Sequence, residues 1–128
     1  MLVESPLNPI TGEIIGAAIE VHRILGPGLL ESTYLTCLQY ELTARRLRFT
    51  SQRTIPVVYK GTSLDAAYRV DLIVEDSVIV ELKCVDAFAP VHRAQLLTYL
   101  RLTGCSVGLL MNFNVAKLTD GIKRVLNT

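Results

Sequence analysis

Apolar residues recur every three or four positions in two neighbouring stretches near the start of the chain, and this spacing is typical of α-helices. The pattern predicts one helix over residues 10–25 and a second over residues 30–46, separated by a turn at Gly26-Pro27-Gly28. The first helix is apolar around most of its circumference, so we expect it to pack on two sides. Residues 1–9 contain two prolines and are expected to form a loosely held N-terminal arm.

Farther along, short runs of β-branched residues replace the helical spacing and favour strands. They predict strands over residues 52–59, 69–74 and 78–83, joined by polar turns, so that three consecutive strands form an antiparallel meander. Pro56 lies inside the first of these strands and has no backbone N–H to donate. That strand is therefore predicted to lie at an edge of the sheet.

The last third of the chain adds a helix, a strand and a final helix. Pro90 and Gly104 bracket a helix over residues 91–102. Residues 106–113 are almost wholly apolar, as in a strand buried on both faces, and the crossover before them makes this strand parallel to the third. Residues 117–126 have the spacing of an amphipathic helix. We therefore expect an α/β fold over residues 10–128, with a mixed four-stranded sheet (an antiparallel three-strand meander plus one parallel strand) flanked by helices.

Composition mainly excludes other classes of protein. The hydrophobic and charged fractions, 50% and 20%, are those of an ordinary globular domain. The apolar runs are too short to span a bilayer, and the chain opens without a basic-then-apolar leader, so we expect neither membrane association nor a secretory signal. Three cysteines without a C-x-x-C pair predict neither a disulfide framework nor a zinc site, and they favour a reducing, cytoplasmic location.

The net charge of +1 is small but unevenly distributed. Residues 1–44 carry five acidic side chains and one basic one, whereas residues 45–128 carry seven acidic and twelve basic ones. This asymmetry permits a basic face that contacts the phosphates of a nucleic acid. The candidates for that contact are Arg45, Arg46, Arg48, Arg53, His92 and Arg93. The alternative is that these side chains are simply solvated.

The predicted turn at residues 75–77 has a chemical consequence. An odd-length turn sets Asp71 opposite Glu81, with both carboxylates on one face of the sheet and Lys83 on the same face. Two carboxylates this close repel each other unless one takes a proton or a divalent cation binds both. Mg²⁺ suits such a pair, because it binds one or two carboxylates and keeps several waters. The alternative is a solvated surface hairpin.

The order of elements and four motifs resemble the PD-(D/E)xK nuclease superfamily and its restriction-endonuclease-like core. Asp71, followed on the next strand by Glu81-Leu82-Lys83, is similar to the central motif of that superfamily. Gln95-Leu96-Leu97-Thr98-Tyr99 is similar to the Gln-x-x-x-Tyr element of its exonuclease-like branch, and Gly28-Leu29-Leu30-Glu31-Ser32-Thr33-Tyr34 matches the signature of the small group called GxxExxY proteins. Val70 stands where the superfamily's name has proline, which the metal chemistry does not need.

The resemblance implies a metal site with defined ligands. Asp71 and Glu81, helped by the backbone carbonyl of Leu82, would bind Mg²⁺ or Mn²⁺. Glu31 would reach in from its helix to hold an outer-shell water or a second ion.

The resemblance also implies a reaction. Lys83 would position the attacking water, and Gln95 and Tyr99 would fix the substrate phosphate or brace Lys83. The function implied is a metal-dependent nuclease that hydrolyses phosphodiester bonds, with DNA favoured over RNA. The alternative is a catalytically inactive nucleic-acid- or protein-binding module on the same fold, and a structural or regulatory subunit is a third reading. The sequence leaves open whether cleavage occurs at ends or internally. It also leaves open whether the protein forms a homo-oligomer or binds a protein partner.

Overall fold

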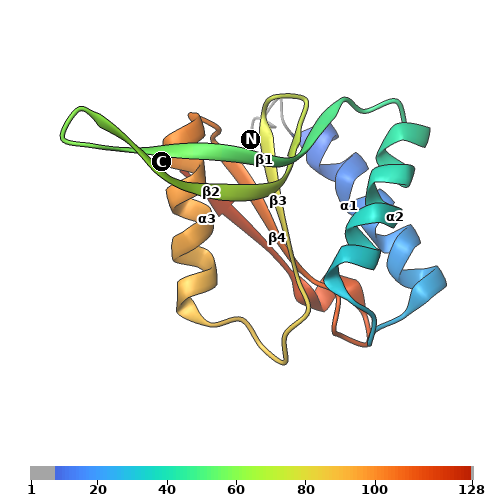
Figure 1. The fold of residues 1–128 in the computed structure, drawn as a ribbon. Helices are drawn as coiled ribbons and strands as arrows, with labels where there is room; N and C mark the ends of the chain where they lie inside the picture. Colours follow the sequence, from blue (N-terminus) through green and yellow to red (C-terminus); the bar gives the residue numbers. More distant parts are fainter. Residues whose placement is uncertain (1–7, 128) are drawn as a thin grey trace, which may run out of the picture.

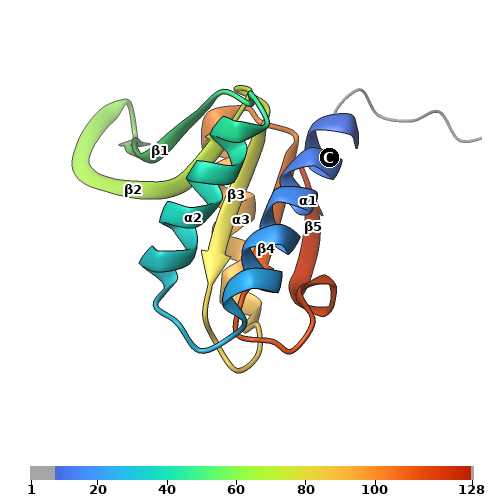
Figure 2. The ribbon, with the colours of Figure 1, turned by 90° about the vertical axis from the view of Figure 1, so that its right-hand side faces the viewer.

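The computed structural model describes residues 8–127, which form three layers with a sheet in the middle (Figure 1). Helices α1 and α2 cover one face of the sheet and helix α3 covers the other (Figures 1 and 2). In chain order the elements are α1 (Asn8–Leu25), α2 (Glu31–Ala44), β1 (Phe49–Tyr59), β2 (Thr62–Val74), β3 (Val78–Lys83), α3 (Pro90–Thr103), β4 (Val107–Asn112), the 3₁₀ helix η1 (Leu118–Gly121) and β5 (Ile122–Leu126).

The strand order in the sheet is β1-β2-β3-β4-β5. The pairs β1–β2, β2–β3 and β4–β5 are antiparallel, whereas β3–β4 is parallel. The predicted mixed sheet, an antiparallel meander followed by a parallel strand, is therefore confirmed. α3 is the crossover that returns the chain so that β4 runs in the same direction as β3.

Each face of the sheet has its own hydrophobic core. On one face, strand residues such as Leu72 and Val80 pack with α1 and α2. On the other face, Ile79 packs with Leu96 and its neighbours on α3. Because β3 is covered on both sides, its residues are buried almost throughout, and a charged side chain inside this strand is costly unless it is paired.

The turn between β2 and β3 has the predicted length of three residues. Val74 pairs with Val78 across it. Glu75 and Asp76 both have positive φ, of 52° and 51°, and the Ser77 N–H donates to the Val74 carbonyl at 3.0 Å. This primed turn matches the twist of the flanking strands. The register that it fixes decides which side chains share a face.

The predicted helix over residues 117–126 is wrong, because this stretch forms η1 and then β5 along the edge of β4. The apparent helical spacing arises because Ile122 and Val125 pack into the two different cores, and residues three apart on a strand point to opposite faces. A Cβ atom at position 121 would lie 2.4 Å from the Asn112 carbonyl oxygen, so glycine, which has none, fits there. The sheet therefore has five strands, not four.

The N-terminal boundary also differs from the prediction. α1 begins at Asn8, so residues 8 and 9 of the predicted arm belong to the helix, and residues 1–7 lie outside the described residues. A proline at the start of a helix is tolerated because its missing N–H would have no helical partner. Across residues 8–127, no helix is both long enough and apolar enough to cross a membrane.

β1 and β2 are longer than predicted and form a hairpin that reaches across α3 (Figure 1). Its two-residue turn, Lys60-Gly61, has positive φ at both positions, 51° and 76°, as a tight hairpin requires. β1 lies at the edge of the sheet, as Pro56 predicted, and the register of the hairpin shifts between Pro56 and Val57.

Candidate active site

β2 and β3 separate where their acidic residues lie. Backbone pairing runs from the turn as far as Leu72 and Val80. Beyond that pair, the Asp71 N–H donates to Glu81 Oε1 at 2.9 Å, and the Leu82 N–H donates to Asp71 Oδ2 at 2.9 Å. The two carboxylates thus bridge the separating strands and lie close together, as the turn length predicted.

Strand β1, which pairs with β2 on the side opposite β3, is also irregular next to Asp71. On β1, Ser51 pairs with Leu72 and Arg53 pairs with Val70, so Gln52 lies across from Asp71. Gln52 has a φ of 52°, which is uncommon for a residue with a side chain. Strained backbone of this kind concentrates at functional sites. Asp71 therefore occupies a position where the sheet is distorted on both sides.

Burial and mutual repulsion control the charge of the acid pair. Glu81 is only 5% exposed. Its burial, together with the charge of Asp71, raises the pKa of Glu81 to about 8. Burial also raises the pKa of Asp71, against the lowering effects of the Leu82 N–H and the Lys83 ammonium. At neutral pH the metal-free pair therefore holds a proton.

The carboxylates offer the oxygen donors that a hard divalent cation uses. Each carboxylate accepts one backbone N–H with one of its oxygens, and among the residues whose side chains the structure describes, no hydrogen bond engages the other oxygen. In the same part of the chain, no three His, Cys, Asp or Glu side chains meet as a metal-binding group. A third ligand would therefore have to be a backbone oxygen or water.

Leu82 can supply that backbone oxygen. Its N–H points toward β2, and the N–H and C=O of one strand residue point to the same side. The next carbonyl, that of Lys83, points the other way and accepts the Phe113 N–H at 2.9 Å. Two carboxylates and one carbonyl suit Mg²⁺ or Mn²⁺, which would also relieve the repulsion between the acids. The residues present thus fit the predicted ion.

Lys83 and Glu31 approach the acid pair from β3 and α2. Lys83 is half-buried, and its charge lowers the pKa of Asp71, Glu81 and Glu31. Glu31 is the first residue of α2 and is exposed to solvent. Burial and then the charge of Asp71 nevertheless raise its pKa. Glu31 therefore lies at the rim of the site, within electrostatic reach of Asp71.

Tyr34 holds the turn that starts α2, a role that the sequence analysis missed. Its hydroxyl donates to the Gly26 carbonyl at 2.5 Å and accepts the Leu29 N–H at 3.2 Å. Its buried ring stacks on Phe113, with 4.6 Å between the ring centroids. Tyr34 thereby fixes the N-terminus of α2, which carries Glu31. The Gly-x-x-Glu-x-x-Tyr spacing was the available signal.

Tyr99, on α3, lies within electrostatic reach of the acid pair, and Tyr68, on β2, contacts Tyr99. Tyr99 is buried, and burial raises its pKa to about 12, with further contributions from Glu81, Asp71 and Tyr68. Gln95 lies one helical turn before Tyr99 and is half-buried. The Tyr68 ring lies 5.6 Å from the Tyr99 ring, centroid to centroid. The structure thus brings Tyr99 close to the acids and adds Tyr68, which the sequence analysis did not single out.

The structure does not bring the arginine cluster after α2 to the acid pair. Arg45 pairs with Glu13 at 3.0 Å, and Arg48 pairs with Glu75 at 3.1 Å. Glu75 belongs to the β2–β3 turn, four residues along from Asp71 and at the opposite end of the paired segment. Arg46 follows α2 with a φ of 60° and is exposed. The proposed contact of these residues with nucleic acid stays a prediction.

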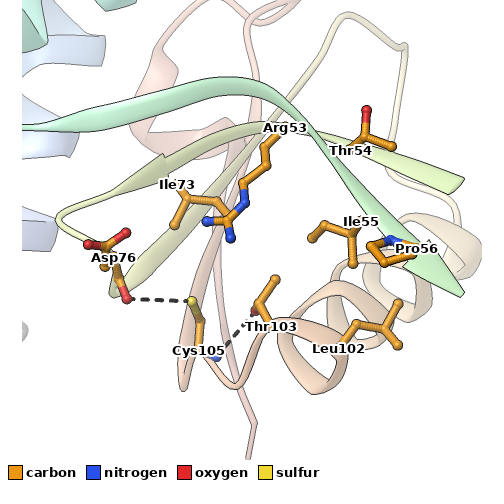
Figure 3. A pocket seen from close by; sticks show the side chains of 9 residues that line it. All are labelled: Arg53, Thr54, Ile55, Pro56, Ile73, Asp76, Leu102, Thr103 and Cys105. Carbon is orange, nitrogen blue, oxygen red and sulfur yellow. Dashed lines mark hydrogen bonds between the residues drawn. The ribbon is translucent and has the colours of Figure 1, made fainter. Parts of the chain in front are cut away.

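The remaining basic candidates have separate surroundings. Arg53 points into a cavity of about 340 Å³ between the β1–β2 hairpin and the C-terminal end of α3, shared with Asp76 and Thr103 (Figure 3). His92 caps α3, because its Nδ1 accepts the Ala89 N–H at 3.0 Å. Arg93 is exposed on the same helix. None of the three is placed beside the acid pair by a contact among the described residues.

Comparisons with known proteins concern the family and the fold of this chain. The family described as the PD-(D/E)XK nuclease superfamily matches residues 8–125. Among solved structures, the crystal structure of SSO0001 is similar, with a TM-score of 0.57 at 16% identity, over 94% of this chain and 59% of that one. At this identity the likeness concerns the fold alone, and the chain spans little more than half the length of that protein. No curated protein matches the sequence.

Proposed function

Because the chain belongs to the PD-(D/E)XK nuclease superfamily, we propose that it is a metal-dependent nuclease that hydrolyses phosphodiester bonds of nucleic acid, with DNA as the preferred substrate. The observation that carries the proposal is the acid pair. A carboxyl group with a pKa of about 8 inside a sheet costs stability, and strongly shifted groups of this kind concentrate at functional sites. A fold-supporting hydrogen bond alone would not need two adjacent acids and a lysine.

Each residue near the pair has a chemical role in this proposal. Asp71, Glu81 and the Leu82 carbonyl hold Mg²⁺ or Mn²⁺, which supplies Lewis-acid chemistry at the phosphate when bound. Lys83 donates hydrogen bonds to the attacking water and counters the negative charge that develops on the phosphate. Glu31, at the open rim, holds an outer-shell water.

Gln95 and Tyr99 act from α3. Their amide and hydroxyl groups are hydrogen-bond donors on one face of the helix, one turn apart. In this proposal they donate to the phosphate oxygens and fix the phosphate over the acid pair. Membership of the narrower GxxExxY group agrees with the position of Glu31 and Tyr34 but is likewise part of the proposal.

The experiment compares cleavage of fluorescent single- and double-stranded DNA and RNA, with Mg²⁺, with Mn²⁺ and with chelator. The parent protein should cut at least one substrate, only when the ion is present. Asp71→Asn, Glu81→Gln and Lys83→Ala should each abolish cleavage. Lys123→Ala is the matched control, because Lys123 is exposed on β5 and takes no part in the site, so this variant should cleave like the parent.

Two outcomes would contradict the nuclease proposal. Cleavage that survives in all three site variants would come from another site or a contaminant. A parent protein that binds nucleic acid but never cuts it, with either ion, would instead support the inactive binding module on the same fold.

A further inference from the structure

A cavity of about 280 Å³ opens between β2 and the N-terminal half of α3. Its lining consists of Tyr68, Val91, Ala94, Gln95 and Thr98. Ala94, Gln95 and Thr98 lie three, four and seven positions after Val91, so these four residues form one stripe of α3. Tyr68 faces this stripe from β2. We refer to this space as the α3 cavity.

We propose that the α3 cavity receives the base of an unpaired nucleotide next to the scissile phosphate, so that the substrate is single-stranded or frayed nucleic acid. The inference rests on the proposed nuclease function and specifies its substrate class. Neither the family match nor the similar fold assigns a base-binding residue to this chain, and Tyr68 lies outside the motifs.

The lining has the chemistry that binds a nucleobase. Tyr68 is 42% exposed and Val91 is 64% exposed, so an aromatic face and an aliphatic side chain are available to the two faces of a planar ring. Aromatic stacking is the usual way in which proteins hold unpaired bases. Gln95 adds a carbonyl oxygen that can accept a hydrogen bond from the edge of a base while its NH₂ group donates to the phosphate. The Thr98 hydroxyl donates to the Ala94 carbonyl at 3.1 Å and can still accept a hydrogen bond.

The contact between Tyr68 and Tyr99 links the α3 cavity to the candidate active site. The Tyr68 ring contacts the Tyr99 ring at 5.6 Å and 58°. Gln95, in the cavity, and Tyr99, beside the acids, lie on one face of α3. Along β2, Tyr68 precedes Asp71 by three residues, a rise of roughly 10 Å. Val70 and Ile73, which flank Asp71, both pack in the core under α3, so the usual alternation of faces is broken at Asp71 and Tyr68 stays on the α3 side. A strand whose phosphate lies at Asp71 can therefore place a neighbouring base at Tyr68.

The cavity favours an unpaired base over a duplex. Bases inside a duplex are stacked on both faces and use their Watson–Crick edges for pairing, so they cannot lie between Tyr68 and α3 unless they leave the stack. The volume also suits one planar ring system, because it lies at the small end of ligand cavities. A peptide or a second protein copy would need a wider apolar surface.

The test measures binding in chelator, so that cleavage does not interfere. Fluorescent single-stranded and blunt duplex DNA are titrated with the parent, Tyr68→Ala and Tyr68→Phe. Tyr68→Ala should weaken single-strand binding roughly tenfold, and Tyr68→Phe should bind like the parent because its ring still stacks. Binding of blunt duplex should change little. Tyr59→Ala is the matched control, because Tyr59 is exposed on the same hairpin away from the cavity, and it should leave binding unchanged.

A second readout reports base stacking directly. A single-stranded probe carrying 2-aminopurine should lose fluorescence on binding to the parent and to Tyr68→Phe, but keep it with Tyr68→Ala. An abasic probe should bind the parent and Tyr68→Ala equally. The proposal is overturned if the parent does not bind single strands, if Tyr68→Ala binds them like the parent, or if sedimentation shows a parent dimer that Tyr68→Ala dissociates.

The results separate this inference from the nuclease proposal. Cleavage by the parent with unchanged single-strand binding in Tyr68→Ala would remove the base site and leave the nuclease. Tyr68-dependent binding of single strands without any cleavage would keep the base site and remove the nuclease.

Discussion

The Asp71 N–H donates to the Glu81 carboxylate, and the Asp71 carboxylate accepts the N–H of Leu82, the residue after Glu81, both at 2.9 Å. In a regular antiparallel pair, backbone carbonyls would accept these N–H groups. Here two acidic side chains replace them. The same carboxylates therefore support the fold and form the candidate cation site, so a substitution at either position has two separable effects.

Asp71→Asn and Asp71→Ala separate those effects. Both should lose metal binding and cleavage, because neither supplies a carboxylate. Relief of repulsion alone would make Asp71→Ala neutral or stabilising in the metal-free protein. The structure adds an opposing effect, since alanine leaves the buried Leu82 N–H without its acceptor, whereas the asparagine carbonyl can still accept it. Asp71→Ala should therefore unfold with about 1–3 kcal/mol less free energy than Asp71→Asn. Urea unfolding in chelator measures the difference, and equal stabilities would contradict a supporting role for this bond.

Lys83→Ala should separate chemistry from metal binding. Its ammonium group has no lone pair to give a cation, so metal affinity should be kept or rise slightly, while cleavage should be abolished, a fall of about 100-fold or more. The metal-free variant should be less stable, because the acid pair loses its positive neighbour. Calorimetric Mn²⁺ titration, melting curves with and without chelator, and cleavage rates measure the three effects. A Lys83→Ala protein that cleaves like the parent would remove Lys83 from the mechanism.

The raised pKa of Glu81 predicts how stability depends on pH. The folded protein binds the Glu81 proton more tightly than the unfolded chain does. Folding therefore takes up a proton at any pH between the ordinary pKa of a glutamate, 4.5, and the raised pKa of about 8. The stability of the metal-free protein should therefore fall as pH rises through this window. Chemical unfolding at several pH values in chelator measures the slope. Glu81→Gln is the control and should flatten the slope, since glutamine does not titrate.

The same proton predicts how metal binding depends on pH. A cation must displace it, so Mn²⁺ affinity should rise with pH and level off near the Glu81 pKa of about 8. Calorimetry in buffers of different ionisation enthalpy should detect the released proton. Affinity that is constant from pH 6 to pH 8 would place the ion away from Glu81.

Gly121→Ala tests the corrected C-terminal structure. A Cβ atom there would lie 2.4 Å from the Asn112 carbonyl oxygen, so the backbone must move and the variant should lose roughly 2 kcal/mol or more of unfolding free energy. Gly12→Ala is the matched control, because its Cβ meets nothing within 4 Å on α1. It should gain about 0.5–1 kcal/mol, since alanine favours helix. Thermal melts compare the two, and a neutral Gly121→Ala would contradict the close approach of residue 121 to the Asn112 carbonyl.

The sequence alone determined the features that depend on neighbouring residues. The spacing of apolar residues predicted α1, α2 and α3, the β-branched residues predicted β3, and the almost wholly apolar run over residues 106–113 predicted β4, because these patterns are local properties. The approach of Asp71 to Glu81 was equally accessible, since it follows from the length of one turn.

The tertiary structure decided the features that depend on distant parts of the chain. β5 was mistaken for a helix because Ile122 and Val125 each face a different core, and sequence spacing does not say how many faces are buried. The pairing of Arg48 with Glu75 likewise required the turn to fold back near α2. Tyr68 contacts Tyr99 only because the β1–β2 hairpin crosses α3 in the folded protein. The burial that raises the pKa of Glu81 comes from the layers around β3. The sequence near Glu81 does not show which distant segments will cover it.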